Sequence, residues 1–371
     1  MPMSQTASTT EVQGGDTVRN DKVTKLSELE LMSALAGLFM KGLTVKEMQK
    51  EMVERYGKAG EMNREQPYRI LREAGRRGFF RFTPPPDHAI ERRISDHFLW
   101  LKRVNVVRTV VPLDVARETA EMLLRLVQDF YKNDPDKNEI HIGFAAGLSM
   151  REVAKSFAHM LTYPVPGLPE TLVFHAMLSG HDPGDPTTDP NNFFTFFIHP
   201  PTLQFRTEFV GFRAPAIVET ESIPEFMRIK EISDARLAAR ELDIIVTSGA
   251  DWEDEDSSLL RCMQRSSSTV ETLRGEGTVG DMLWLPLGET APITTPTSVR
   301  ALTIMELTDL PEFIQRGKHV LLMLGPCSQC DRHKGRILRT IFAQNEHIVT
   351  HVVVDSRTGG YLANSIDQGL I

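Results

Sequence analysis

The apolar positions near the start of the chain predict three short helices. On the first, four apolar residues recur at steps of three and four positions: Leu31, Ala34, Leu35 and Leu38. A second helix is expected after Thr44, because Thr44 and Glu47 have the spacing of a capping box. A third is expected from Asn63 to about Arg77, with Asn63 as its N-cap and Pro67 in its first turn.

The stretch after the third helix predicts the end of a first domain. Residues 79–82 are expected to form a short strand, and three helices followed by a strand are typical of a winged helix-turn-helix. Three consecutive prolines at 84–86 form a stiff break. We therefore assign residues 25–83 to a winged helix-turn-helix domain and 84–110 to a linker, in which 91–108 are expected to be helical.

The remainder of the chain alternates between short apolar strands and helical stretches. The expected strands cover residues 106–113, 140–147, 171–178, 216–220, 243–249, 319–325 and 347–355. Helices are expected between them, among others at 114–131, 149–161 and 191–205. This alternation predicts an α/β fold with a doubly wound, mostly parallel sheet, which we assign to residues 111–371.

Length, charge and cysteine content narrow the class of protein. The chain of 371 residues is long enough for two domains, and its net charge of −8 excludes a uniformly basic protein. No apolar run approaches the roughly 18–20 residues that cross a bilayer, and the first residues lack the layout of a secretion signal. Three cysteines make no disulfide framework, which indicates a reducing, cytoplasmic setting. Residues 1–24 are polar and are expected to be disordered.

The third helix gathers positive charge within this acidic chain. Between residues 63 and 81, six arginines stand against two glutamates, a local net charge of +4. The expected contacts to double-stranded DNA are Asn63, Arg64, Gln66, Tyr68, Arg69, Arg72 and Arg76. Arg64 and Gln66 are suited to base edges in the major groove, whereas Arg72 and Arg76 are suited to phosphates. The alternative is a small helical docking module whose arginines are only solvated.

The order and spacing of several motifs resemble the SorC family of sugar-responsive transcriptional regulators. The motifs are GLTVKEMQKEM, NREQPYRILREAGRRGFFRF, IHIGFAAGLSMREVAKSF, DIIVTSGAD, GTVGDML and HVLLMLG with KGRIL, and together they span about residues 30–360. The resemblance implies an effector domain with the fold of glucosamine-6-phosphate deaminase and ribose-5-phosphate isomerase, without their activity. It also implies a homo-oligomer, a tetramer or dimer, whose binding to operator DNA is altered by a sugar or sugar phosphate.

A strand-to-helix loop in the second domain predicts an anion site. Ligands in open α/β sheets collect at the carboxyl ends of strands, and a loop that opens a helix offers backbone N–H groups to an anion. The loop residues are Ala146, Gly147, Leu148 and Ser149. In the SorC family this loop holds a phosphate, and Leu148 stands where a hydroxyl is common. The alternative is a tight turn without a ligand.

The resemblance implies further effector contacts at two other strand ends. Gly249 ends a predicted strand, and Asp251 follows where the family often has an acidic residue that contacts sugar hydroxyls. Lys334 corresponds to a family lysine that reaches the ligand phosphate, with Arg332 or Arg336 as alternatives. A solvated acidic loop is the alternative interpretation of Asp251.

Two cysteines and a histidine follow the strand at 319–325, with the spacing Cys327-x-x-Cys330-x-x-His333. This spacing fits a zinc site, a thiol redox pair or a plain loop beside the pocket. A structural zinc site needs a fourth ligand, and the sequence has no second pair of cysteines at this spacing, so we assign no metal and no cofactor. No role is assigned to three other histidines, His175, His181 and His199.

Together these features predict a DNA-binding transcriptional regulator that responds to a small sugar or sugar phosphate. The alternative is an isomerase- or deaminase-type enzyme with an N-terminal helical domain. Such an enzyme needs a base with a tuned pKa beside the substrate carbon, and the sequence offers no convincing acid–base pair. Asp281 lies in the motif GTVGDML, which belongs to the resemblance, and a structural role is its alternative interpretation. We therefore expect a protein that is not an enzyme.

Overall fold

The computed structural model describes residues 26–77, 79, 83–162, 165–182, 184–198, 205–253, 257–264 and 266–371. The chain divides into two compact units, residues 1–83 and 84–371. The predicted disordered segment and most of the predicted wing strand, residues 80–82, lie outside the described residues. Within the described ranges, no helix is both long enough and apolar enough to cross a membrane.

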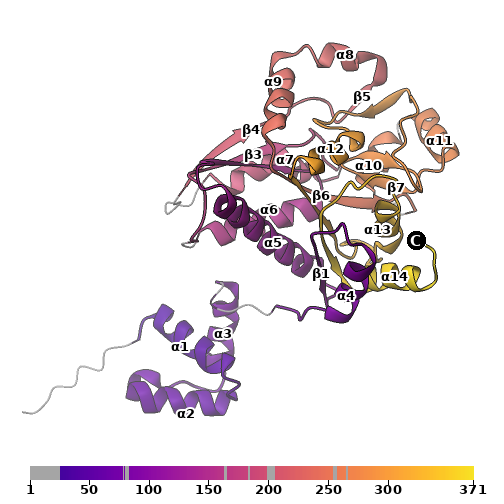
Figure 1. Cartoon of the computed structure of the whole chain (residues 1–371). Helices are drawn as coiled ribbons and strands as arrows, with labels where there is room; N and C mark the ends of the chain where they lie inside the picture. The colour runs from indigo at the N-terminus through magenta and orange to yellow at the C-terminus, as the bar shows by residue number, and fades with distance from the viewer. Residues whose placement is uncertain are drawn as a thin grey trace, which may run out of the picture. The chain divides into compact units, whose positions relative to one another are not determined.

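The first unit contains the three predicted helices, α1 (Glu28–Met40), α2 (Val45–Tyr56) and α3 (Gln66–Arg76) (Figure 1). Thr44 and Glu47 form the predicted capping box, in which the Thr44 hydroxyl accepts from the Glu47 N–H and the Glu47 carboxylate accepts from the Thr44 N–H. A small apolar core joins the helices: Leu35, Leu38, Met48, Met52 and Leu71. Burial of these side chains stabilises the three helices, each of which is too short to be stable in isolation.

The start of the third helix differs from the prediction. The Asn63 side chain accepts hydrogen bonds from the Glu65 and Gln66 N–H groups, at 3.1 and 2.9 Å, and Gln66 Oε1 accepts from the Asn63 N–H. These bonds satisfy backbone groups that a helix end leaves open, so residues 63–65 form a capping turn and α3 begins at Gln66.

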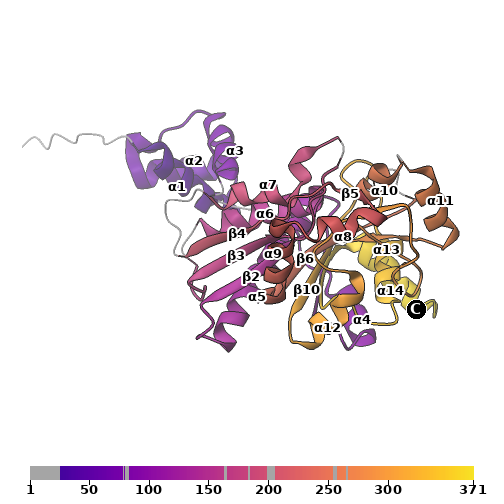
Figure 2. The same cartoon turned by 90° about the horizontal axis from the view of Figure 1, so that it is seen from above.

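The second unit is built on a parallel sheet, which confirms the predicted fold class. Its strands are β1 (Arg103–Val107), β2 (Glu139–Phe144), β3 (Thr171–Ala176), β4 (Arg206–Val210), β6 (Ile244–Asp251), β10 (His319–Leu324) and β11 (His351–Asp355). They lie in the order β1-β11-β10-β6-β2-β3-β4, with every neighbouring pair parallel. Figure 2 shows strands β4, β3, β2, β6 and β10 following one another across the sheet.

Helices cover this sheet, and short antiparallel elements extend it. The long helices α5 (Pro112–Asn133) and α6 (Leu148–Leu161) pack against each other, and α13 (Gly335–Phe342) packs against α14 (Ser356–Asp367). The shorter helices are α4 (His88–His97), α7 (Pro190–Phe193), α8 (Ile223–Phe226), α9 (Lys230–Ala238), α10 (Ser258–Met263), α11 (Ser267–Gly275) and α12 (Leu310–Gln315). The hairpin β7 (Gly280–Met282) and β8 (Leu285–Leu287) continues from the end of β6, while β5 (Ile217–Glu219) pairs with β9 (Val299–Ala301) outside the main sheet.

The prediction of a linker over residues 84–110 is wrong, because this segment is part of the second unit. Helix α4 packs against α14, and β1 pairs with β11 at the edge of the sheet. The predicted helix over 91–108 ends at His97, because Val104 and Val106 alternate with more exposed residues and are buried as a strand. The predicted strand at 106–113 is correspondingly displaced, since α5 begins at Pro112.

The prediction of a helix over 191–205 is also wrong. Helix α7 ends at Phe193, a 3₁₀ turn covers Phe194–Phe196, and β4 follows from Arg206. Phenylalanines spaced like a helix face are instead buried in an aromatic cluster, in which the rings of Phe174 and Phe197 stack at 4.0 Å. Their apolar spacing therefore reflects packing into the core rather than a continuous helix.

The strand order produces one point at which the connections change direction. After β2 the chain moves outward to β3 and β4, whereas after β6 it moves the other way, to β10 and β11. The strands β2 and β6 are neighbours, so the loops that leave their carboxyl ends diverge and open a crevice between them. Open α/β sheets bind ligands at such a switch point.

At the opposite, amino ends of the same strands lies a buried carboxylate. Asp243, directly before β6, is fully buried, and its Oδ1 accepts from the ammonium groups of Lys137 and Lys318 (the latter at 2.6 Å). Its Oδ2 accepts from the His141 N–H at 3.0 Å, and the His319 N–H donates to its main-chain oxygen at 2.9 Å. Asp243 thus connects the starts of β2, β6 and β10.

Candidate functional site

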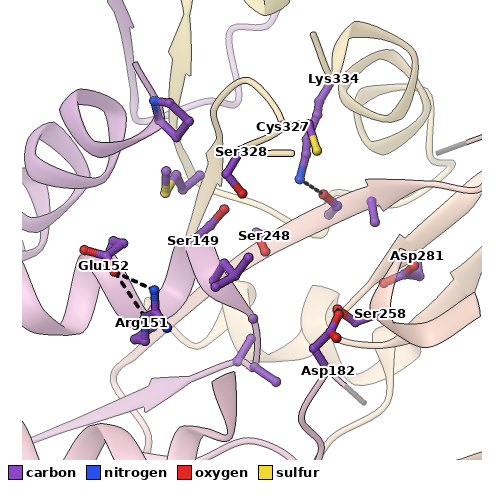
Figure 3. A pocket seen from close by; sticks show the side chains of 18 of the residues that line it. Ser149, Arg151, Glu152, Asp182, Ser248, Ser258, Asp281, Cys327, Ser328 and Lys334 are labelled. Carbon is purple, nitrogen blue, oxygen red and sulfur yellow. Dashed lines mark hydrogen bonds and ion pairs between the residues drawn. The ribbon is translucent and has the colours of Figure 1, made fainter. Parts of the chain in front are cut away.

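A cavity of about 190 Å³ lies at the switch point of the second unit. Its wall is formed by three segments that follow neighbouring strands: residues 145–149 after β2, 248–250 at the end of β6 and 326–329 after β10. Figure 3 shows the polar side chains from these segments together with those of Asp182, Ser258, Asp281 and Lys334 around one space. We refer to this cavity as the switch-point pocket.

The loop after β2 presents the start of a helix to the pocket. Gly147 has φ of 119°, a conformation that favours glycine, and its N–H donates to the Thr188 carbonyl at 3.0 Å. Helix α6 begins at Leu148 without a side-chain cap from any described residue, and Leu148 and Ser149 line the pocket. The first N–H groups of a helix carry partial positive charge, so this loop is suited to an anion.

Two arginines beside the pocket are neutralised by carboxylates. Arg151 donates to Glu152 and to Asp185, both at 3.1 Å. Arg261 donates to Asp182 Oδ2, which also accepts from the Ser258 hydroxyl at 2.9 Å. Asp182 is buried, and its remaining oxygen accepts from a backbone N–H. The two arginines therefore hold the pocket wall together and add little net charge to it.

Lys334 places its positively charged ammonium group at the pocket, where it donates to a neutral carbonyl. Its Nζ donates to the Gly249 carbonyl at 2.9 Å, and its own N–H donates to Thr358 Oγ1 at 3.1 Å. An ammonium group has three donors, so a ligand in the pocket can accept from Lys334 while the bond to Gly249 is kept. Helix α6 and Lys334 together make the pocket attractive to an anion.

Asp281, on β7, contributes a carboxyl group that is close to half protonated near neutral pH. Burial raises its pKa to about 7, against the opposing effects of hydrogen bonds from Ser257 and Trp252 and of the Lys334 charge. The Ser257 hydroxyl and the Trp252 indole N–H donate to Oδ2 at 3.1 and 3.3 Å. A carboxyl group in this state can both donate to and accept from a ligand hydroxyl.

The raised pKa of Asp281 predicts a pH-dependent stability. In the folded protein the carboxyl stays protonated up to about pH 7, whereas in the unfolded chain it ionises near pH 4. The stability of the folded protein that depends on the protonated Asp281 carboxyl is therefore fully present below about pH 4 and is lost as the pH rises towards 7. We expect Asp281→Asn to gain stability relative to wild type over this interval and to hold the gain above it, measured by urea unfolding from pH 5 to 8. A constant difference at all these pH values would contradict the raised pKa.

The structure brings most of the predicted effector residues together. Those that line the pocket are Ala146, Gly147, Leu148, Ser149, Gly249 and Lys334. Asp251 is not among the lining residues, because β6 continues to this position and pairs with β7. Its carboxylate lies 3.5 Å from Arg336 and accepts from the Glu253 N–H at 2.9 Å. The sequence analysis missed Asp182, in the loop after β3, and also Ser258 and Arg261, which lie on helix α10.

The segment with two cysteines forms a closed turn at the pocket rim. The Cys327 N–H donates to the Arg332 carbonyl at 2.9 Å, the Asp331 N–H donates to the Cys327 carbonyl at 3.0 Å, and Cys327 lines the pocket. The ring of His333 lies 5.4 Å from that of Tyr361. Among the described residues, no three side chains of His, Cys, Asp or Glu are grouped to hold a metal ion. A thiol redox pair at Cys327 and Cys330 and a plain loop beside the pocket stay open as the alternative interpretations.

In the first unit, α3 presents a polar face with little internal pairing. Its exposed residues are Tyr68, Arg69, Arg72 and Arg76, while Pro67, Leu71 and Ala74 are buried. Arg76 lies 3.9 Å from Glu73, and no ion pair within residues 26–77 involves Arg64, Arg69 or Arg72. Asn63 and Gln66, two predicted DNA contacts, bond to each other in the capping turn.

Comparison with known proteins identifies relatives by fold. No known sequence family matches the chain, and no curated protein matches it either. The full-length sorbitol operon regulator SorC from Klebsiella pneumoniae superposes with a TM-score of 0.60 at 15% identity, covering 91% of this chain and all of that one. A DeoR family transcriptional regulator from Listeria monocytogenes superposes with a TM-score of 0.54 at 18% identity, covering 74% of this chain and 98% of that one. The resemblance to SorC-type regulators is therefore confirmed at the level of the fold.

Proposed function

We propose that this protein is a DNA-binding transcriptional regulator whose binding to its operator is changed by a small sugar or sugar phosphate. The observation that carries the proposal is the combination, in one chain, of an arginine-bearing helix-turn-helix unit with a ligand pocket at the switch point of an α/β unit. The fold shared with a sorbitol operon regulator over 91% of the chain supports the same conclusion.

The exposed face of α3 supports duplex DNA as the partner of the first unit. Arg69 and Arg72 lie one turn apart on this face, and a recognition helix in the major groove uses such side chains on bases and phosphates. A module that docks onto another protein would more often expose an apolar stripe. On α3, Tyr68 is the one large apolar side chain that is more than half exposed, at 56%.

The switch-point pocket supports a phosphorylated sugar as the effector. Lys334 and the start of α6 are suited to a phosphate, while Asp182, Asp281 and Ser258 offer the acceptors and donors that sugar hydroxyls require. With a volume of about 190 Å³ the pocket suits a small molecule rather than a polymer. We further propose that the effector shifts the population of a homo-oligomer whose geometry sets the spacing of paired recognition helices.

The enzyme alternative has less support. A sugar-phosphate isomerase needs a base that reaches a substrate carbon. In each of the two buried carboxyl groups of the pocket, Asp182 and Asp281, one oxygen accepts hydrogen bonds from two neighbouring side chains, which favours a role in binding. An enzyme would also leave the arginines of α3 without a role. We therefore propose that the protein acts by binding rather than by catalysis.

The direct test is binding of the full-length protein to fragments of its own promoter region, followed by addition of a panel of sugars and sugar phosphates. We expect binding that is specific, weakens with salt, and is changed by one member of the panel. Absence of specific DNA binding under all conditions, or turnover of a sugar phosphate, would reject the proposal.

Substitution of Lys334 is expected to weaken binding of the effector while leaving the fold intact. Lys334→Met removes a charge-assisted hydrogen bond, typically about 1.5–3 kcal/mol, so affinity for a phosphorylated effector should fall at least about tenfold. Isothermal titration calorimetry measures this change. Lys155→Met, at an exposed position of α6 outside the pocket, serves as the matched control and should bind like wild type. Equal affinity of the two variants would remove Lys334 from the site.

A further inference from the structure

A second cavity, of about 180 Å³, lies beside the switch-point pocket in the same unit. It is bounded by β8, the segment 292–297, the end of β9 and helices α10 and α11. Much of its wall is apolar: Met263, Leu273, Leu285, Pro286, Ile293 and Leu307. Two further prolines, Pro292 and Pro296, add surface without an N–H donor.

The polar groups of this cavity favour an uncharged occupant. Its two charged side chains, Arg300 and Glu306, pair with each other at 2.6 Å, so together they add no net charge to the wall. The remaining polar side chains are threonine hydroxyls. This wall contrasts with that of the switch-point pocket, which presents Lys334 and a helix start.

Trp284 belongs to the walls of both cavities. It lies in the turn between β7 and β8, where Leu283 and Trp284 have φ of 56° and 61°, a left-handed conformation that Asn-Gly adopts far more easily. The ring also packs closely on Gly180, because a Cβ atom added there would lie 2.5 Å from Trp284 Cζ3. A bulky side chain is thus kept in an unfavourable turn at the boundary of two cavities, and strained residues of this kind cluster at ligand sites.

We propose that this cavity is a second small-molecule site, which takes an uncharged molecule with a single aromatic or alicyclic ring. The size supports this class, since roughly 150 Å³ lined by apolar side chains is enough to hold benzene. The occupant would contact Trp284, the residue that the two cavities share. The two ligands are therefore chemically distinct, one anionic and one apolar.

The test is ¹⁹F NMR titration of the full-length protein with 4-fluorobenzyl alcohol as the probe. We expect saturable binding by wild type, and at least a tenfold loss when the cavity is filled from inside by Ala301→Leu or from its rim by Thr295→Phe. Ala238→Leu, at a partly buried position outside both cavities, is the matched control and should keep the affinity of wild type.

Two variants at different depths protect the test against a folding defect, because Thr295 is only partly buried. Binding is read directly from the probe, so a failure of DNA binding or of sugar-phosphate binding would leave the result interpretable. No saturable binding by wild type, or binding that survives both Ala301→Leu and Thr295→Phe, would overturn the proposal.

Discussion

Replacing Arg69 and Arg72 together with alanine is expected to weaken binding to operator DNA about a hundredfold or more. Both side chains are exposed on α3, and neither forms an ion pair within residues 26–77 that would have to break before DNA is bound. An arginine contact to a base edge is typically worth about 1–3 kcal/mol, and 1.4 kcal/mol corresponds to a factor of ten. Fluorescence anisotropy with a labelled promoter fragment at several salt concentrations measures the loss.

The salt dependence separates two roles for these arginines. Loss of a phosphate contact lowers the slope of log K against log salt by about one unit, whereas loss of a base contact reduces discrimination between operator and unrelated DNA. The control is Arg236→Ala/Arg240→Ala, which removes two arginines from the second unit and should leave DNA binding unchanged. If this control weakened binding as much as the α3 variant, net charge rather than the recognition helix would explain the effect.

Local sequence signals predicted those parts of the structure that depend on neighbouring residues. The capping box at Thr44 and Glu47 requires only contacts three positions apart, and it forms as predicted. The anion loop at 146–149 likewise requires only a strand followed by a helix, which the apolar pattern shows. Long-range pairing is not visible in such patterns. The apolar spacing of segment 103–107 predicted part of a helix, whereas the segment is a strand because it pairs with β11, some 250 residues later.

The difference between local and long-range signals also explains which residues of the candidate site could be predicted. Gly147 and Lys334 could be predicted because each lies at a strand end or in a motif resembling a known family. Asp182 and Arg261 could not, because they meet across 79 residues of chain and neither has a distinctive local pattern. The surroundings of Asp251 differ from the prediction because β6 ends at Asp251, two residues beyond its predicted end at Gly249. β6 extends through this position to pair with β7, which turns the carboxylate towards Arg336 instead of the pocket.

Asp243 is where the parallel sheet is expected to be most sensitive to a single substitution. Its carboxylate is fully buried and accepts from two lysines, while the side chains of those lysines remain only 28% and 22% exposed. Removing one member of a buried ion pair leaves the other charge without compensation, which generally costs more than the pair itself contributes. At Asp243 one carboxylate compensates two cations, and it also accepts the His141 N–H.

We therefore expect Asp243→Ala to lower the free energy of unfolding of the second unit by about 3–5 kcal/mol. The lysines would be left near each other without a counterion, and the starts of β2, β6 and β10 would lose their common acceptor. Urea unfolding followed by circular dichroism measures the change. Asp234→Ala, which removes a carboxylate from an exposed pair with Lys230, should leave the urea midpoint unchanged. A midpoint for Asp243→Ala close to that of this control would mean that water already solvates the two lysines, and that Asp243 adds little to the stability of the sheet.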